Sequence, residues 1–301
     1  MGARADLDRH PATQPLGADG GLGGPADPIP QGAQREMSRM RSRARALGRW
    51  VARAGAVLTV GLLVAPAVPA LAQPPELRVC TPGDYPPYAT AEGGYRGVDI
   101  DLARGFADLL GRPIAFVPLT WASLKTDFAA LHCDIAVGGI SDAPARRAFA
   151  DFSITYGTDG KTPITRRGNE TEYATIEQIN RPGVRVIANR GGTNEEFARR
   201  NFPQAQLTLW PENLTIFDEV EQGRADVFVT DAVEGRYRVR QHPGLRVLHP
   251  DRPFDSFGKI MLVRKDDPGL AISLNAWLAS QIATGATDRL FAQWIGPDAT
   301  A

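Results

Sequence analysis

Two carboxylates, Asp231 and Glu234, lie three residues apart where an apolar run over residues 225–229 gives way to a predicted helix. On the first turn of a helix, both side chains can face the same side. In open α/β sheets, ligands bind where strands end and helices begin, so this spacing predicts a pair of site carboxylates. The alternative is a capping box, with Asp231 as the N-cap and Glu234 as its N3 partner. The segment alone favours the capping box, whereas the rest of the chain favours a site.

A second candidate is the glycine-rich turn over residues 190–193, which opens a helix predicted at 194–201. Glycines let the backbone approach a ligand closely, and the first N–H groups of a helix are free to bind an anion. Thr193 and Asn194 can add side-chain hydrogen bonds. The alternative is an ordinary turn with Thr193 as the helix N-cap.

Several other kinds of site have no signature in the sequence. It contains no nucleophile elbow, phosphate-binding loop or dinucleotide fingerprint. His132, His242 and His249 show no metal-ligand spacing, so we expect no metal site. Cys80 is predicted late in one strand and Cys133 just before another, at heights too far apart for disulfide geometry. We therefore expect the two cysteines not to pair.

The first 72 residues are expected to lie outside the fold. Residues 1–36 are rich in Gly, Pro, Asp and Gln without apolar periodicity, which predicts disorder. Residues 37–72 combine a basic run, an apolar segment and a small-x-small sequence at 70–72. Together these predict an export signal peptide and a periplasmic mature protein. A retained membrane anchor is the alternative, but the apolar segment is short for a membrane span. Met37 and Met40 are alternative starts.

The charge balance restricts the partners. The full chain has 34 basic and 34 acidic residues. Removing residues 1–72 takes away nine basic and five acidic residues, which leaves 25 and 29 and a net charge of about −4. This balance argues against nucleic acid or anionic membrane as a partner. The remaining 229 residues suit one large domain or two small ones.

The order of the predicted elements indicates two α/β lobes. Strands are predicted at residues 77–81, 114–119, 134–140, 184–188, 206–209, 225–230 and 245–248, and helices at 100–110, 120–131, 194–201, 213–222, 268–284 and 287–295. This alternation implies parallel sheets covered by helices. Extended segments at 151–165 and 255–263 are predicted to cross between the lobes. We expect a hinged clamshell with its site in the cleft. Lobe 1 would comprise 77–162 and 256–296, and lobe 2 would comprise 163–255.

Motifs along the chain resemble known proteins at two levels. The chain resembles the type II periplasmic solute-binding fold, in the amino-acid-binding branch called family 3. The motifs that carry this resemblance are Asp84-Tyr85-Pro86-Pro87-Tyr88, Gly97-Val98-Asp99-Ile100-Asp101, and Gly139-Ile140-Ser141 followed by Arg146. More specifically, the chain resembles the periplasmic cyclohexadienyl dehydratases, enzymes built on that fold. The motifs that carry this closer resemblance are Glu92-Gly93-Gly94-Tyr95, Asp159-Gly160-Lys161-Thr162-Pro163-Ile164, Gly191-Gly192-Thr193-Asn194-Glu195, Asn213-Leu214-Thr215-Ile216-Phe217 and Thr230-Asp231-Ala232-Val233-Glu234. The match spans about residues 77–295. Cys80 departs from the pattern, because a smaller residue is expected there.

The resemblance implies a lyase that converts prephenate to phenylpyruvate and arogenate to phenylalanine, with loss of CO2 and water. Formation of the aromatic ring drives the reaction, so the resemblance implies no cofactor. It also implies that Glu234 is the general acid, with its pKa raised by burial, and that Lys161 is a site lysine beside it. The implied substrate-binding residues are Arg146, Ser141, Gly139, Thr193, Asn194, Gly192, Asp231, Trp121 and Tyr85.

Alternatives remain for individual residues and for the whole protein. Arg146 could be a surface residue paired with Asp142 or Asp151, Trp121 could be core packing, and Lys161 a solvated hinge charge. The whole protein could instead be an amino-acid receptor that delivers its ligand to a membrane permease, with Asp231 on the ligand's ammonium. A ligand-sensing module is a third alternative. The enzyme needs a small-molecule substrate and no stable membrane partner.

Overall fold

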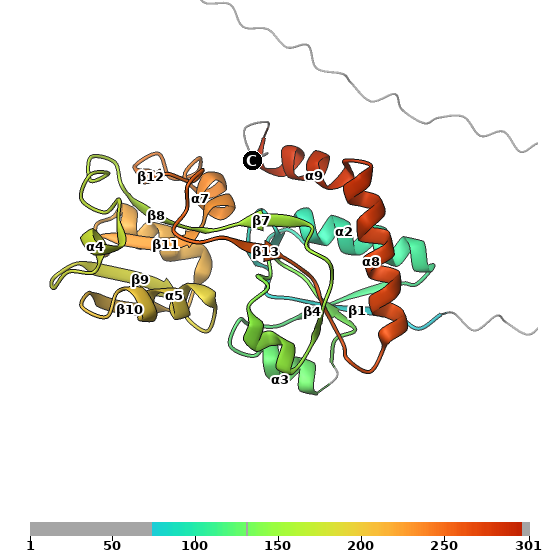
Figure 1. The fold of residues 1–301 in the computed structure, drawn as a ribbon. Coiled ribbons are helices and arrows are strands. Elements are labelled where there is room, and N and C mark those ends of the chain that lie inside the picture. Colours follow the sequence, from blue (N-terminus) through green and yellow to red (C-terminus); the bar gives the residue numbers. More distant parts are fainter. Residues whose placement is uncertain (1–73, 131, 297–301) are drawn as a thin grey trace, which may run out of the picture. The chain divides into compact units, whose positions relative to one another are not determined.

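The computed structural model describes residues 74–130 and 132–296 (Figure 1). The predicted disordered extension at 1–36 and the predicted export signal at 37–72 lie outside these residues. Among the helices in the described ranges, none combines the length and the apolar character that a membrane span requires.

The first sheet is built from β1 (Leu77–Thr81), β4 (Ile114–Pro118), β5 (Ile135–Ala136), β6 (Asp151–Phe152) and β14 (Leu262–Val263). The strand order is β4-β1-β5-β14-β6. Strands β4, β1 and β5 run parallel, and β14 is antiparallel to both of its neighbours. Parallel neighbours need a crossover connection, which the predicted alternation of strands and helices supplies.

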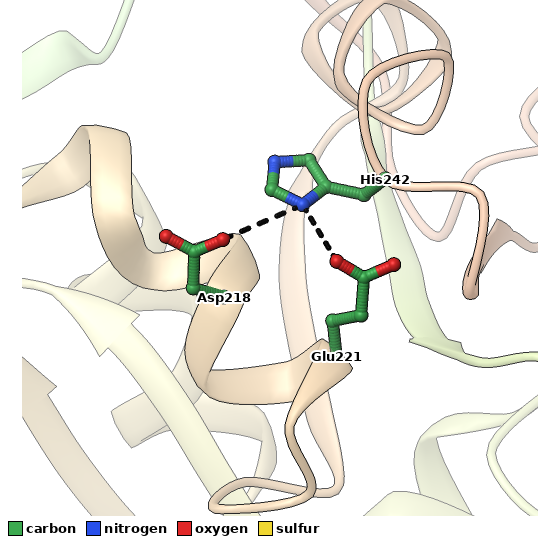
Figure 2. A group of neighbouring side chains, drawn as sticks. All are labelled: Asp218, Glu221 and His242. Atoms are coloured by element: carbon green, nitrogen blue, oxygen red, sulfur yellow. Dashed lines mark hydrogen bonds and ion pairs between the residues drawn. The ribbon is translucent and has the colours of Figure 1, made fainter.

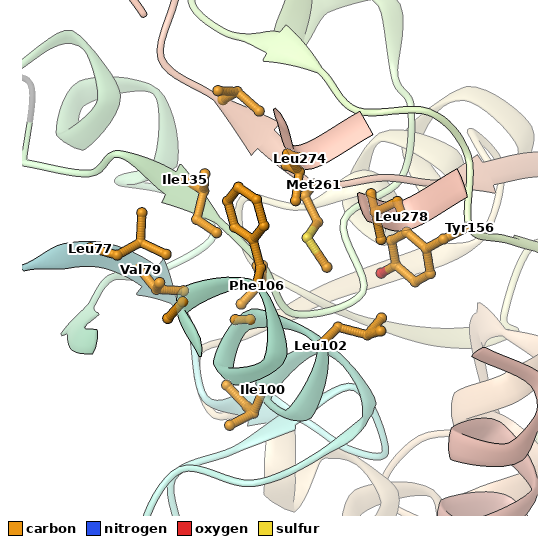
Figure 3. Packing of buried hydrophobic residues seen from close by; sticks show 14 of the residues in the cluster. Leu77, Val79, Ile100, Leu102, Phe106, Ile135, Tyr156, Met261, Leu274 and Leu278 are labelled. Atoms are coloured by element: carbon orange, nitrogen blue, oxygen red, sulfur yellow. The ribbon is translucent and has the colours of Figure 1, made fainter. Parts of the chain in front are cut away.

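Helices cover both faces of this sheet, namely α2 (Val98–Leu110), α8 (Pro268–Ala283) and α9 (Ala286–Ile295) on one face and α3 (Leu124–Ala129) on the other. Successive strand residues point to opposite faces, so Val79 packs against α2 and Cys80 packs against α3. Figure 3 shows side chains of β1, α2 and α8 directed toward one another around Phe106.

The second sheet is built from β8 (Lys161–Arg166), β9 (Arg185–Asn189), β10 (Gln206–Trp210), β11 (Val227–Asp231) and β12 (Leu245–Val247). Its order is β10-β9-β11-β8-β12, with β10, β9 and β11 parallel and β8 antiparallel to β11 and β12. The helices of this part are α4 (Ile176–Ile179), α5 (Thr193–Asn201), α6 (Ile216–Glu221) and α7 (Ala232–Arg238). Phe197 of α5 packs on one face of the sheet and Phe217 of α6 on the other.

Two short strands link the sheets, β7 (Gly157–Asp159) and β13 (Phe257–Lys259). They pair antiparallel, so the two crossings run side by side (Figure 1). Two five-stranded sheets joined by paired crossings confirm the predicted α/β fold with two lobes. The remaining short elements are β2 (Asp84–Tyr85), β3 (Ala89–Thr90), η2 (Pro144–Ala148) and η3 (Asn213–Thr215).

Cys80 and Cys133 form a disulfide, so the prediction that they do not pair is wrong. Cys80 lies opposite Ala136 in the sheet, three residues beyond Cys133, and the prediction assumed an extended chain between them. The chain bends at Asp134 instead. There the Asp134 carboxylate accepts hydrogen bonds from the backbone N–H and the guanidinium of Arg78. The bend brings the two cysteine Cα atoms to 5.5 Å, within disulfide range.

Two element boundaries also differ from the prediction. Helix α3 begins at Leu124 rather than near residue 120, because the Ser123 hydroxyl accepts a hydrogen bond from Thr120 N–H at 2.9 Å and closes a turn there. Strand β5 ends at Ala136 rather than at 140. It cannot continue through Gly138 and Gly139, whose φ angles are 123° and 73°.

Candidate functional site

Residues from the two sheets and from the segments that follow their strands meet around a small cavity of about 10 Å³. Most of its wall is made by segments that follow the carboxyl ends of the parallel strands β4, β5, β9 and β11, where α/β proteins bind ligands. The lining residues are Tyr85, Trp121, Gly139, Ser141, Arg146, Asn189, Gly192, Thr193, Asn194 and Asp231.

The structure brings all the residues implied for the site into one neighbourhood. All the implied substrate-binding residues line the cavity. Asn189 lines it too and was not predicted. Lys161 and Glu234 do not line it. Lys161 donates to Thr193 and Asp231 of its wall, and Glu234 is connected to Asn194 of the wall through the Thr230 hydroxyl. Ligand pockets usually enclose about 300 Å³ or more, so a ligand can enter only if the walls move apart.

Asp231 lies between two buried lysines, one from the start of β8 and one from the end of β13. Lys161 Nζ donates to Asp231 Oδ1 and Lys259 Nζ donates to Asp231 Oδ2, each at 2.5 Å. Burial alone would raise the pKa of Asp231, but the charges of the two lysines outweigh burial and hold the pKa below its ordinary value. Asp231 occupies the N-cap position of α7 without a side-chain capping bond, so the capping-box alternative is not found.

Glu234, in the first turn of α7, is 1% exposed, and no cationic side chain of the described residues lies within hydrogen-bond reach of it. Its carboxyl accepts a hydrogen bond from the Thr230 hydroxyl at 2.5 Å and another from the Asn213 side-chain amide at 3.5 Å. Burial, with a smaller contribution from the charge of Asp231, raises the pKa of Glu234 to about 8 against the opposing effect of the Thr230 hydrogen bond. At neutral pH this carboxyl therefore holds a proton.

A continuous chain of hydrogen bonds joins the two carboxyls. Thr230 Oγ1 accepts from Asn194 Nδ2 at 2.9 Å and donates to Glu234. Asn194 Oδ1 accepts from Lys161 Nζ, which also donates to Asp231 and, at 3.0 Å, to the Thr193 hydroxyl. All three Lys161 protons are therefore engaged, so the alternative of a solvated hinge charge is contradicted.

Arg146, in η2, points toward the cavity and donates to the Ser141 carbonyl at 2.6 Å. Burial lowers the pKa of Arg146, although a guanidinium stays charged in proteins. Within the described residues it forms no ion pair with Asp142 or Asp151, the partners that the surface alternative requires. Its remaining N–H groups can receive a carboxylate in the fork geometry that arginine favours.

Helix α5 begins at Thr193, with Gly192 at its N-cap and no side-chain capping bond. Thr193 is therefore the first helical residue rather than the cap. Gly191 has a φ of 84°, and a side chain there would approach the Ala122 backbone to 2.8 Å. This close approach explains why glycine is needed in the turn and why the helix start can reach the cavity.

An aromatic pair forms another part of the wall. The rings of Tyr85 and Trp121 meet edge to face, with centroids 5.5 Å apart. Trp121 also packs against the hydrophobic cluster beneath α3, so it forms part of the cavity wall and also contributes to core packing. Trp121 Nε1 donates to Asp84 Oδ1 at 3.1 Å. Burial raises the pKa of Asp84 to about 6, partly offset by this hydrogen bond.

Sequence reasoning missed Lys259 and Asp159, one from each crossing. Lys259 is fully buried and donates to the Gly139 carbonyl at 2.7 Å. Asp159 accepts from the Tyr88 hydroxyl at 3.1 Å, and burial together with the Asp231 charge raises its pKa to about 6. The signal for Lys259 was a lone lysine in the otherwise uncharged run at 256–263.

A larger cavity, of about 700 Å³, lies beside the two crossings. Its walls include parts of β7, α7, α9 and the loop before β13. It contains none of the residues predicted for the site. We assign the candidate site to the smaller cavity, because the convergent polar side chains and the perturbed carboxyl of Asp231 line it and Glu234 is linked to its wall through Thr230 and Asn194.

One group in the described part of the chain could hold a metal ion, and it lies outside both cavities (Figure 2). It consists of Asp218, Glu221 and His242, which the sequence does not bring together by spacing. His242 Nδ1 lies 3.0 Å from Glu221 Oε2, while Glu221 Oε1 accepts Gly244 N–H at 2.8 Å. These bonds explain the cluster as an anchor that ties the 242–244 loop to α6.

Comparisons with known proteins agree with this geometry. The family model of bacterial extracellular solute-binding proteins, family 3, matches residues 77–297. The cyclohexadienyl dehydratase of Pseudomonas aeruginosa is 43% identical over 221 residues, which cover 73% of this chain and 82% of that protein. The L-cystine-binding protein of Escherichia coli K12 is 22% identical over 226 residues, covering 74% of this chain and 84% of that protein.

A solved structure gives the same result at the level of the fold. An ancestral amino acid-binding protein, described as a precursor of cyclohexadienyl dehydratase, is 33% identical with a TM-score of 0.68. The match covers 73% of this chain and 95% of that one. The relatives thus include both an enzyme and amino-acid-binding proteins, so the chemistry of the site must distinguish the two.

Proposed function

The chain belongs to the bacterial extracellular solute-binding proteins of family 3, and we propose that it is a cyclohexadienyl dehydratase. The observation that carries the proposal is Glu234, a buried carboxyl whose pKa of about 8 keeps it protonated beside a cleft of this fold. An amino-acid receptor has no evident need for such an acid. The 43% identity to the P. aeruginosa dehydratase supports the same choice.

The reaction requires one proton and no external oxidant or reductant. Prephenate and a proton give phenylpyruvate, CO2 and water, and arogenate reacts in the same way to give phenylalanine. Glu234 donates its proton to the ring hydroxyl as the C–O bond breaks, while the electrons of the bond to the ring carboxylate complete the aromatic ring. Glu234 then regains a proton from solvent. General acid catalysis of this kind contributes about 10²–10⁴ in rate.

The other residues bind and position the substrate. Arg146 holds a substrate carboxylate, with the free N–H groups at the start of α5 close by. Tyr85 and Trp121 face the ring of the substrate. Asp231, ionised between its lysines, helps to keep the proton on Glu234. The proposal requires that widening of the cavity brings the ring hydroxyl within hydrogen-bond reach of Glu234.

The location of the protein follows the same proposal. Family 3 proteins are extracellular, and we propose a periplasmic enzyme exported by the signal at 37–72. In the mature enzyme, lobe 1 would comprise residues 77–162 and 256–296, and lobe 2 would comprise residues 163–255. The disulfide between Cys80 and Cys133 supports an oxidising compartment. Mass spectrometry of the exported protein should find a start near Gln73, and a species that keeps residues 39–53 would contradict the export signal.

The second candidate is an amino-acid receptor of a transporter, supported by the receptors among the relatives. One assay separates the candidates. The mature protein is incubated with prephenate at neutral pH without added cofactor, and phenylpyruvate is followed by its absorbance. We expect saturable turnover. Tight amino-acid binding with no turnover would favour the receptor.

A further inference from the structure

The side chain of Lys259 occupies a site built for a primary ammonium group. Its Nζ donates to the Gly139 carbonyl at 2.7 Å, to Asp231 Oδ2 at 2.5 Å and to the Ser141 hydroxyl at 3.4 Å. A carbonyl, a carboxylate and a hydroxyl are together a complete set of acceptors for the three protons of an ammonium.

Aromatic rings complete this ammonium site. Lys259 Nζ lies 4.9 Å from the ring centroid of Tyr88, 5.2 Å from that of Phe257 and 5.5 Å from that of Tyr85. Rings at such distances attract cations, and the attraction grows when water is excluded. Lys259 is 0% exposed, so its charge depends wholly on these partners.

The acceptors of this ammonium site also line the ligand cavity, since Gly139, Ser141 and Asp231 are all in its wall. An amino-acid ligand needs such acceptors for its own ammonium. Asp231 is the one carboxylate among the ten lining residues, and both of its oxygens are engaged by lysines. An incoming ammonium must therefore displace a buried lysine or lie against two cations.

The charges around the cavity favour a ligand with two carboxylates. Among the lining residues and the lysines paired with Asp231, Arg146, Lys161 and Lys259 contribute three positive charges and Asp231 contributes one negative charge. A 2-oxo acid with a ring carboxylate brings two negative charges and no ammonium. The corresponding 2-amino acid brings the same carboxylates and adds an ammonium that finds no free acceptor.

We propose that Lys259 determines specificity by filling the ammonium site with the chain's own side chain, so that the cleft prefers the 2-oxo substrate prephenate over the 2-amino substrate arogenate. This inference rests on the proposed function for the identity of the two substrates. The charge preference itself concerns any pair of 2-oxo and 2-amino acids with the same ring.

Binding of the two reaction products tests the preference without turnover. Calorimetry would give the affinities of wild-type protein for phenylpyruvate and for phenylalanine. We expect phenylpyruvate to bind about tenfold or more tightly than phenylalanine. Equal affinities, or tighter binding of phenylalanine, would overturn the inference.

Kinetics separate this inference from the proposed function. Wild-type kcat/KM for prephenate should exceed that for arogenate by about tenfold or more. Equal values for the two substrates would overturn the inference and leave the proposed function standing. If neither substrate turns over, the proposed function fails and the product affinities still decide the inference.

Substitution of the lysine gives the sharpest test. Lys259→Met keeps the length of the side chain without its charge, and it frees Gly139, Ser141 and one Asp231 oxygen for a ligand ammonium. We expect the preference for phenylpyruvate over phenylalanine to fall about tenfold, mainly through a gain in phenylalanine affinity. An unchanged preference in a folded variant would contradict the role of Lys259.

Two further variants are controls. Lys265→Met removes an exposed lysine that lies 3.7 Å from Asp151, and it should leave the preference unchanged. Lys259→Arg keeps the positive charge, so this variant should still bind phenylpyruvate more tightly than phenylalanine. If Lys259→Met does not fold, Lys259→Arg and the wild-type product affinities still decide the inference.

Discussion

Asp231 and Glu234 lie on the same helical turn, are both almost fully buried, and have opposite ionisation behaviour. Asp231 is 2% exposed and is held by two lysines, which lower its pKa. Glu234 is 1% exposed, meets a hydroxyl and an amide at hydrogen-bond distance among the described residues, and has a pKa of about 8. Two carboxyls that are equally buried therefore differ in charge because their partners differ. The lysines keep Asp231 ionised, whereas Glu234, without them, stays protonated and can donate a proton.

The comparison also explains why the lysines come from the crossings. Lys161 begins β8 just after the first crossing strand and Lys259 ends the second, so both reach Asp231 at the end of β11. Asp231, at the strand end, is within their reach. Glu234, three residues further along in the first turn of α7, contacts Thr230 and Asn213 instead.

Replacing the proton donor should have the largest effect. Glu234→Gln keeps the size of the side chain but cannot release a proton, so kcat on prephenate should fall by about 10²–10⁴ while KM changes little. Steady-state kinetics with prephenate would measure kcat and KM of the variant and of the wild-type protein. Glu212→Gln, which removes a nearby exposed carboxyl, is the matched control. A near-normal kcat in Glu234→Gln would remove this residue from the mechanism.

Replacing the anion should act mainly on stability. Asp231→Asn leaves two buried lysines without a counter-charge, which should cost about 3–5 kcal/mol in the free energy of unfolding. Urea denaturation would measure the loss. Asp266→Asn breaks an exposed pair with Arg264 and should leave the free energy of unfolding nearly unchanged. Similar results for the two variants would mean that the Asp231 lysines are not buried in solution.

The pH dependence of turnover should follow Glu234. Its pKa is raised, so the active acid form is present below about pH 8 and is lost above it. We expect kcat to be level near pH 7 and to fall about tenfold per unit at pH values well above 8. Measurements from pH 7 upward avoid the titration of Asp84 and Asp159, whose pKa values are about 6. A kcat that stays level to pH 10 would contradict the raised pKa.

Stability should report the same raised pKa independently of activity. The folded-state pKa of Glu234 is above its ordinary value of 4.5, so the wild-type protein binds an extra proton when folded between about pH 4.5 and 8. It therefore loses stability as pH rises through that window, whereas Glu234→Gln does not. The stability difference in favour of Glu234→Gln should grow across the window and then level off. A difference independent of pH would argue against the assignment.

Most of the fold could be predicted because its signals are local. The alternation of apolar strands with helices such as α2 and α5 indicated the parallel strands of both sheets, and the unpatterned segments between them indicated the crossings. The expectation of wholly parallel sheets is wrong, because β8 and β14 run antiparallel to their neighbours. The disulfide could not be predicted, because it depends on a bend at Asp134 that a side-chain hydrogen bond creates. The start of α3 depends in the same way on the Ser123 hydroxyl.

The site was predicted where a motif carried it and missed where tertiary pairing carried it. Arg146, Thr193 and Asp231 lie in motifs that a resemblance can find, whereas Asn189 lies in none of them. Lys259 lies in a run that reads as an ordinary buried crossing, and it meets Asp231 only because β13 pairs with β7. Such contacts depend on pairing between segments about a hundred residues apart, which local patterns do not show.

The protonation of Glu234 is the central claim, and infrared difference spectroscopy of wild-type protein against Glu234→Gln at pH 7 measures it most directly. At that pH, Asp84 and Asp159 are mostly ionised, since their pKa values are about 6. We predict a carbonyl stretch of a protonated carboxylic acid in the wild-type protein that is absent from the variant and titrates away near pH 8. A difference spectrum with only carboxylate bands at pH 7 would contradict the account.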